Sequence, residues 1–152
     1  MATPAPTPTL TSTPTLTPTP TTRPTAVQPV AVIGGHVFLL EVADTPEKHT
    51  RGLMGRASLP RDVAMLFIFE GDAPWALWMK DTLIPLDAIW FDGRGQIVDI
   101  KTMVPEPNKT DAQLTIYVPR APARYILEMN AGLAAEYGFV PGMLVELRLP
   151  GQ

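Results

Sequence analysis

The sequence predicts an α+β domain whose mostly antiparallel sheet closes partly into a small barrel, with two short helices beside it. Three observations lead to this fold class. Apolar runs of roughly four to eight residues recur from about residue 37 to residue 149. A glycine-rich turn joins two of these runs, and two short segments with helical signals separate others. We expect a Thr/Pro-rich arm over residues 1–30 and the globular domain over residues 31–152.

The arm is set apart by its composition. Residues 1–30 contain eight of the 18 prolines and eleven threonines, with Arg23 as the only charged residue. The segment has few large apolar side chains, and their burial cannot offset the conformational entropy that the chain would lose on ordering. We therefore expect a disordered arm. Thr/Pro-rich segments form extended spacers and occur as stalks at cell surfaces. We therefore expect an extracytoplasmic protein whose export signal lies outside this sequence; a cytosolic linker is the alternative.

Charge and composition exclude several classes of partner. The chain has a net charge of −3, and because Arg23 lies in the arm, the domain has a net charge of −4. Its charges are scattered, whereas nucleic-acid binding needs a concentrated basic face. We expect no nucleic-acid partner and no direct membrane insertion, since no apolar run reaches the ~20 residues of a transmembrane helix. The chain has no cysteine, which excludes disulfides and thiolate metal sites.

The first element of the domain is an apolar strand at residues 37–43. A helix is predicted next, with Asp44 as its N-cap and Glu47 in the position of a capping box. We expect two to three turns that end near Gly52 or Gly55.

A buried strand at residues 65–70 and an extended segment at residues 75–82 are expected to follow. Residues 86–92 and 96–104 predict two strands of a hairpin. The turn Asp92–Gly95 joins them, because glycine supplies the positive φ that a tight turn requires.

The last third of the domain begins with a Pro/Asn/Asp-rich loop at residues 105–116, which is the best candidate for a mobile segment. A strand at residues 123–130 and a short helix at residues 131–138 follow. The final strand is expected at residues 143–149.

Four phrases occur in order along the domain: RGLMGRASL (51–59), MLFIFE (65–70), WMKDTLIPLDAIWFD (78–92) and ILEMNAG (126–132). Together they resemble the DUF192 family, also called UPF0127. The resemblance covers about residues 37–149 and implies a compact α+β domain, often exported or membrane-attached, with no activity attached to it. The usual residue after WMK in that family is Asn, whereas this chain has Asp81. A side-chain amide donor that relatives could use is therefore missing here.

The WMKDT phrase concentrates side chains suited to binding. Trp78 offers a flat aromatic surface, Lys80 a cation, Asp81 an anion and Thr82 a hydroxyl. Together with Pro85 and Asp87 they could line one rim of a cleft. Lys80 and Asp81 would face one ligand only if the chain bends between them. The structural alternative is that Trp78 and Met79 fill the core while the polar residues of the phrase, Asp81, Thr82 and Asp87, hold turn amides.

Two arginines and two carboxylates add candidate chemistry. Arg51 and Arg56 flank GLMG, and either could bind Glu128, Asp87 or an anionic ligand in a bidentate geometry. We prefer the structural alternative, an internal salt bridge, because no glycine-rich phosphate loop is present. Asp87 and Glu128 lie on apolar strands, where a carboxylate with a shifted pKa can act as a general acid or base. Glycosidic-bond cleavage uses such a pair.

Other chemistries find little support. Ser58 is the only serine of the predicted domain and lacks a G-x-S-x-G context, and His36 and His49 stand apart in the sequence. We therefore expect no catalytic triad, no metal and no cofactor.

These observations predict a binding or interaction module rather than an enzyme. Its partner would be an unknown small molecule, a saccharide or a protein. A hydrolase that acts on cell-envelope material through Asp87 or Glu128 is the alternative, and a purely structural envelope domain is a third possibility. The candidate binding residues are Arg51, Arg56, Trp78, Lys80, Asp81, Asp87 and Glu128.

Overall fold

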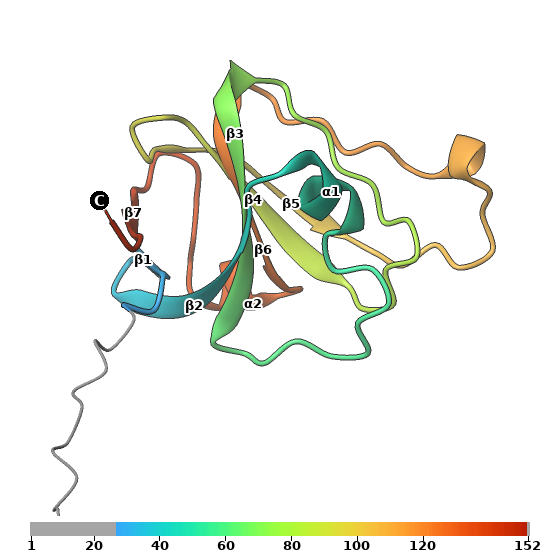
Figure 1. Ribbon diagram of the computed structural model, residues 1–152, viewed down its shortest axis with the longest axis horizontal. Helices are drawn as coiled ribbons and strands as arrows, with labels where there is room; N and C mark the ends of the chain where they lie inside the picture. Colours follow the sequence, from blue (N-terminus) through green and yellow to red (C-terminus); the bar gives the residue numbers. More distant parts are fainter. Residues whose placement is uncertain (1–26, 152) are drawn as a thin grey trace, which may run out of the picture.

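Seven strands form one curled, mixed sheet in the computed structural model, which describes residues 27–151 (Figure 1). The strands are β1 (Val30–Ile33), β2 (His36–Ala43), β3 (Val63–Ala73), β4 (Leu86–Phe91), β5 (Ile97–Met103), β6 (Ala123–Asn130) and β7 (Val145–Arg148). The helices are α1 (Pro46–Arg51), the 3₁₀ turn η1 (Asp111–Gln113) and α2 (Leu133–Glu136).

The strand order across the sheet is β5-β4-β6-β3-β2-β1-β7. Among the described strands, β2 and β3 pair in parallel across α1, and the other pairs are antiparallel. The predicted fold class is therefore confirmed: an α+β domain with a mostly antiparallel, partly closed sheet and two short helices. The predicted arm lies outside the described residues as far as residue 26.

Backbone hydrogen bonds join the two edges of the sheet where β5 and β7 begin. Gln96 and Leu144 form an isolated antiparallel bridge, and the amide of Val145 donates to the carbonyl oxygen of Gly95 at 2.8 Å. Gly95 has a φ of +86°, and a Cβ there would lie 2.7 Å from the Val145 carbonyl oxygen. Only glycine permits this approach. The predicted turn Asp92–Gly95 is thus confirmed, and it also closes the half-barrel.

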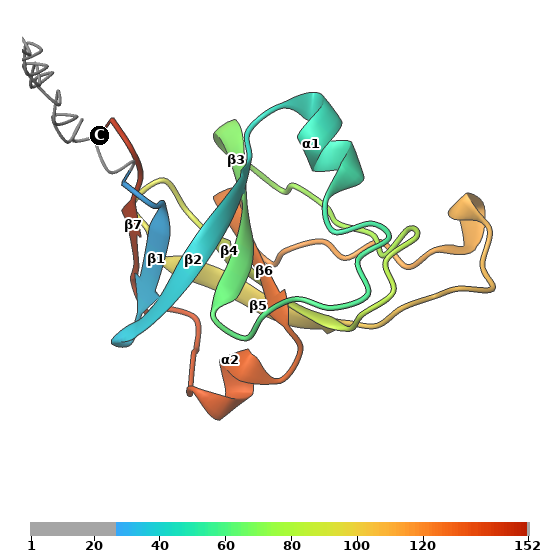
Figure 2. The same ribbon diagram turned by 60° about the horizontal axis from the view of Figure 1, so that its bottom comes forward.

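Both faces of the sheet are covered by apolar side chains. The inner core fills the curl and includes residues of α2, and the outer core lies beneath α1 and the long connections. Figure 2 shows α1 and α2 on opposite sides of the sheet. Strand β4 is buried along its whole length, and because side chains alternate along a strand, it supplies both cores.

Helix α1 is shorter than predicted, and its N-cap is Thr45 rather than Asp44. The Thr45 hydroxyl accepts from the Lys48 amide at 3.4 Å, while Asp44 forms an ion pair with Lys48 at 2.6 Å. The reason is Pro46, which starts the helix and restricts the residue before it to the extended backbone of an N-cap. The helix ends at Gly52, whose φ is +44°.

The segment 75–82 forms a loop rather than the extended run that we predicted. Within it, Leu77 pairs with Tyr117 as an isolated bridge, and the Thr82 amide then donates to the carbonyl of Met79 at 3.2 Å in a turn. This loop runs beside the long connection that carries η1, on the side of the sheet that α1 covers (Figure 1). Turn formation brings polar side chains toward the end of α1.

Two further elements differ from the sequence prediction. Strand β1 was not predicted, since it has only four residues and begins at Val30, the last residue of the predicted arm. Helix α2 covers four residues inside the predicted segment 131–138. Within residues 27–151, no helix has the length and apolar character needed to cross a membrane.

Candidate functional site

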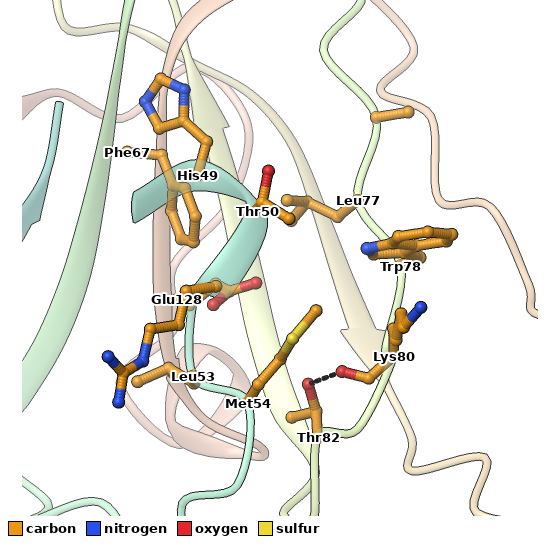
Figure 3. A pocket seen from close by; sticks show the side chains of 13 residues that line it. His49, Thr50, Leu53, Met54, Phe67, Leu77, Trp78, Lys80, Thr82 and Glu128 are labelled. Carbon is orange, nitrogen blue, oxygen red and sulfur yellow. Dashed lines mark hydrogen bonds between the residues drawn. The ribbon is translucent and has the colours of Figure 1, made fainter. Parts of the chain in front are cut away.

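A small cavity opens on the outer face of the sheet beside Glu128 of β6, and we call it the Glu128 cavity. Its volume is about 80 Å³. It is lined by residues 49–54 at the end of α1, by Phe67 of β3, by residues 76–78, 80 and 82 of the loop, and by Glu128. In Figure 3 the Glu128 carboxyl group points into the space bordered by these side chains. Segments far apart in the sequence therefore build one site.

Glu128 is the buried titratable group of this cavity. It is 5% exposed, and no hydrogen bond or ion pair joins its carboxyl to another of residues 27–151. No fully inaccessible side-chain oxygen in this part of the chain lacks a partner, so the Glu128 oxygens are reached through the cavity. Burial raises the pKa of the carboxyl to about 8, because the charged form loses its hydration. Near neutral pH the site therefore holds mainly the neutral acid.

Helix α1 supplies an anchor and a cation. The His49 Nε2 lies 3.0 Å from the carbonyl oxygens of both Ala43 and Ile68. Because carbonyl oxygens only accept, Nε2 carries a hydrogen and donates, which ties α1 to β2 and β3. Arg51 is the last residue of α1, is exposed, and forms no ion pair with any residue that the structure describes. Arg51 is also one of the residues that line the cavity.

The loop supplies the opposite rim. Trp78 is 37% exposed, and the Lys80 Nζ lies 5.5 Å from the centre of its ring. Lys80 also forms an ion pair with Asp111 of η1, and this hydrogen bond raises the pKa of the lysine. The Thr82 hydroxyl donates to the Lys80 carbonyl at 3.1 Å, which fixes the turn below the rim (Figure 3).

Asp81 lies at the turn and does not line the Glu128 cavity; it borders a neighbouring hollow of about 180 Å³ with Lys80. Its φ is +49°, the only positive φ of a non-glycine residue within residues 27–151. Asn and Asp are the side chains that tolerate this conformation best. The Asp81 carbonyl accepts from the Gly55 amide at 2.8 Å. The backbone therefore explains how Asp can stand where the family usually has Asn, without a side-chain amide.

Arg56 forms an internal salt bridge. Its guanidinium makes a bidentate contact with Glu41 of β2, with one N–O distance of 2.9 Å. This hydrogen bond holds the pKa of Glu41 below its usual value. The pair borders a second hollow of about 350 Å³, which Arg51 also lines. Arg56 thus fits the structural alternative, although with a carboxylate that we did not name.

Asp87 is not brought to the Glu128 cavity. It is 1% exposed and points into the inner core, where its Oδ2 accepts from the amides of Gly132 at 2.8 Å and Ala134 at 3.0 Å. Its Oδ1 accepts from the Thr102 hydroxyl at 2.6 Å. These bonds hold the start of α2 against the sheet.

Four of the seven candidate residues line the cavity: Arg51, Trp78, Lys80 and Glu128. The hydroxyl of Thr82, which the sequence suggested for the rim, also lines the cavity, whereas sequence reasoning missed His49 and Thr50 as lining residues. Both missed residues precede the first phrase, although each of the four phrases contributes at least one lining residue. Within the described part of the chain, no group of three His, Asp or Glu side chains is placed to hold a metal ion.

Comparisons with known proteins agree with the phrases. The DUF192 family model, described as "Uncharacterized ACR", matches residues 30–147. A UPF0127 protein from Thermococcus gammatolerans is 31% identical over 111 residues, which is 73% of this chain and 65% of that protein. The chain therefore spans slightly less than two thirds of that relative's length.

Two crystal structures share the fold. One is a protein from Sinorhizobium meliloti 1021 described as a candidate transcription regulator, with a TM-score of 0.70, 33% identity and coverage of 79% of this chain and 92% of that one. The other is a protein of unknown function from Novosphingobium aromaticivorans DSM 12444, with a TM-score of 0.68, 34% identity and coverage of 78% and 83%. Because the family model matches residues 30–147, which is more than half of the chain, this chain belongs to the DUF192 family, also called UPF0127.

Proposed function

We propose that the domain is a binding module whose ligand site is the Glu128 cavity. One observation carries the proposal: a buried carboxyl group without a partner in the described residues lies where all four family phrases meet. Burying a carboxyl without hydrogen bonds costs free energy, and proteins retain such groups mainly at functional sites. A ligand that hydrogen-bonds to Glu128 removes this cost.

The size of the cavity limits what can enter. One water molecule needs roughly 10–15 Å³ on this measure, so about 80 Å³ admits a group of a few atoms. Pockets that enclose a whole small ligand have volumes of about 300–1,000 Å³. The ligand therefore inserts one terminal group and leaves the rest of its body at the rim, where the exposed face of Trp78 offers a contact surface.

The proposal includes a location outside the cytoplasm. The composition of residues 1–30 supports it, since Thr/Pro-rich stalks hold domains away from cell surfaces. An antibody against the domain should detect it in the cell-envelope fraction of its native organism. Recovery exclusively in the cytosol would refute the location and leave the ligand site untouched.

A hydrolase acting on cell-envelope material is the second candidate function. The raised pKa of Glu128 favours it, because a general acid works best with a pKa near the operating pH. Asp87 takes no part, since it lies on the opposite face of the sheet, whereas Arg51, the expected electrostatic support, lines the cavity with Glu128. Release of fragments from purified peptidoglycan that is lost in Glu128→Gln would favour the hydrolase over the binding module.

Transcription regulation, which is the description given for the Sinorhizobium protein, is not part of the proposal, and neither is nucleic-acid binding. The net charge of −4 over the predicted domain is scattered and gives no concentrated basic face.

A fragment screen by protein NMR tests the binding function. The probes are small carboxylates, amines, alcohols and amides, and at least one class is expected to shift the indole signal of Trp78 and amide signals of the loop. Glu128→Leu should abolish these shifts, whereas the matched change Glu136→Leu, on the exposed side of α2, should preserve them. If no class of fragment shifts these signals, the proposal is wrong.

A further inference from the structure

We infer that the group inserted into the Glu128 cavity is a carboxylate on an apolar body, held between the Glu128 carboxyl and the Arg51 guanidinium. This inference rests on the binding function proposed above and names its ligand class. It stands on three features of the site: the charges that line the cavity, the free hydrogen-bonding groups, and the apolar surface at the rim.

The charged and titratable groups that line the cavity with Glu128 are His49 and Arg51 from α1 and Lys80 from the loop. His49 is occupied by two backbone carbonyls, and Lys80 is paired with an aspartate of η1. Of the lysine and the arginine at this cavity, Arg51 is the one that forms no ion pair within the described residues. A cationic rim with one unpaired guanidinium attracts an anionic ligand.

The residues paired with Glu128 on the two neighbouring strands are uncharged. In the sheet register, Glu128 lies between Met65 of β3 and Ala88 of β4, and both are buried. The apolar flanks keep Glu128 poorly hydrated, so it is protonated near neutral pH. A neutral acid does not repel an incoming anion.

The free groups match the two oxygens of a carboxylate. The protonated Glu128 donates its O–H to one ligand oxygen, and an N–H of Arg51 donates to the other, as a charge-assisted hydrogen bond. Two carboxyl groups in close contact share one proton, because both cannot be ionised together. No covalent bond changes in this complex; only the proton of Glu128 is shared.

The rim carries an apolar shelf, which we define as Ala76, Trp78, Ile116 and Val118. The antiparallel bridge between Leu77 and Tyr117 places Trp78 opposite Ile116 and Ala76 opposite Val118. Because side chains alternate along an extended chain, these four side chains lie on the side opposite to those of the bridged pair. Ile116 is 54% and Val118 47% exposed. Ala76 and Trp78 also line the cavity, so the shelf is continuous with it. A ligand with its carboxylate in the cavity would lay an apolar chain on this shelf.

Such a ligand has two sources, an aliphatic acid or the carboxyl terminus of a peptide with apolar residues, and both present the same chemistry. Isothermal titration calorimetry with the full chain tests it, using three probes of the same length: hexanoate, hexanamide and hexylamine. At about pH 6 hexanoate is expected to bind and hexylamine to show no binding. The affinity for hexanoate should fall at least about tenfold by about pH 9, as Glu128 ionises.

Variants separate the roles of the two residues. Glu128→Gln, which mimics the neutral acid, should retain hexanoate binding and remove its dependence on pH. Arg51→Gln should weaken hexanoate binding by about tenfold or more. The matched change Arg56→Gln, at the arginine already paired with Glu41, should leave the affinity unchanged.

Two results would overturn the inference: no binding of hexanoate at about pH 6, or preferential binding of hexylamine with an affinity that rises with pH. If another class of fragment still binds the cavity, the proposed binding function survives without the carboxylate. If no fragment binds, both are lost. An N-acetylated peptide ending in leucine distinguishes the sources, since tighter binding than hexanoate, lost in the peptide amide, identifies a peptide terminus.

Discussion

Asp87 and Glu128 lie on neighbouring strands, yet their carboxyl groups point to opposite faces of the sheet. In the register of β4 and β6, Asp87 faces Met129 and Ala88 faces Glu128. Because side chains alternate along a strand, this offset of one residue puts the sheet between the two carboxyls. Asp87 is saturated by hydrogen bonds at α2, whereas Glu128 opens into a cavity. One carboxyl stabilises the fold, and the other is free for a ligand.

The first prediction separates these two roles. Asp87→Ala removes three hydrogen bonds and leaves the amides of Gly132 and Ala134 without their acceptor. The free energy of unfolding, measured by chemical denaturation, should fall by about 2–4 kcal/mol. Hexanoate binding by the folded variant should not change. A variant of normal stability that no longer binds hexanoate would show that Asp87 belongs to the site after all.

The second prediction concerns the pH dependence of stability. The pKa of Glu128 is about 8 in the folded chain against 4.5 as its ordinary value, so the folded chain binds this proton more tightly. The stabilising effect of protonation is complete below about pH 4.5 and is lost as pH rises to about 8. The whole effect amounts to at most about 5 kcal/mol.

Glu128→Gln, which cannot ionise, should therefore be more stable than the native chain at about pH 8 and close to it at about pH 4. Denaturation curves at several pH values give this difference. If the free energies of unfolding of the native chain and the variant differ by the same amount at every pH, Glu128 titrates normally and the prediction is wrong.

The third prediction follows from the positive φ of Asp81. Asp81→Asn should change the free energy of unfolding by less than about 0.5 kcal/mol, since both side chains tolerate the left-handed region. Asp81→Val should destabilise the protein by about 1–2 kcal/mol, because a β-branched side chain is strained there. Thermal unfolding measures both. Equal stability of the Val and Asn variants would contradict the φ of +49°.

The fourth prediction concerns the long connection between β5 and β6. Glu106 accepts from the amide and the hydroxyl of Thr115 at 2.9 and 2.7 Å and pairs with Lys109 at 2.6 Å. These partners, Lys109 first, lower the pKa of Glu106 to about 2. The contacts should therefore persist above about pH 4.5 and be lost as pH falls through about 2.

Glu106→Gln should accelerate hydrogen exchange of the Thr115 amide by roughly three- to tenfold at neutral pH. The sequence alone made this connection the best candidate for a mobile loop, and the structure shows the contacts that restrain it. An exchange rate that the substitution leaves unchanged would show that other contacts order the loop.

Much of the fold is predictable from local patterns. Strand β6 coincides with the predicted residues 123–130, and the turn Asp92–Gly95 lies where glycine chemistry puts it. Strand β1 was not predicted because a run of four apolar residues after a proline-rich arm is too short to show a strand's alternating pattern. The N-cap of α1 was misplaced by one residue because the effect of Pro46 on the preceding backbone outweighed the capping preference of Asp44.

The candidate site was harder to predict, because strand register decides it. Asp87 and Glu128 both read as carboxylates on apolar strands, and only the pairing of β4 with β6 assigns them to different faces. The partner of Arg56, Glu41, depends on how β2 lies against the end of α1, which no local pattern records. Arg51, Trp78 and Lys80 were found because they lie inside the family phrases.

The most direct test of the account is the titration of the Glu128 side-chain carboxyl carbon, followed by NMR with and without hexanoate. The account predicts a midpoint near pH 8 for the free protein and a higher midpoint with hexanoate bound, because the ligand carboxylate favours the protonated acid. A midpoint near 4.5 that hexanoate does not move would contradict both the buried state of Glu128 and its role in binding.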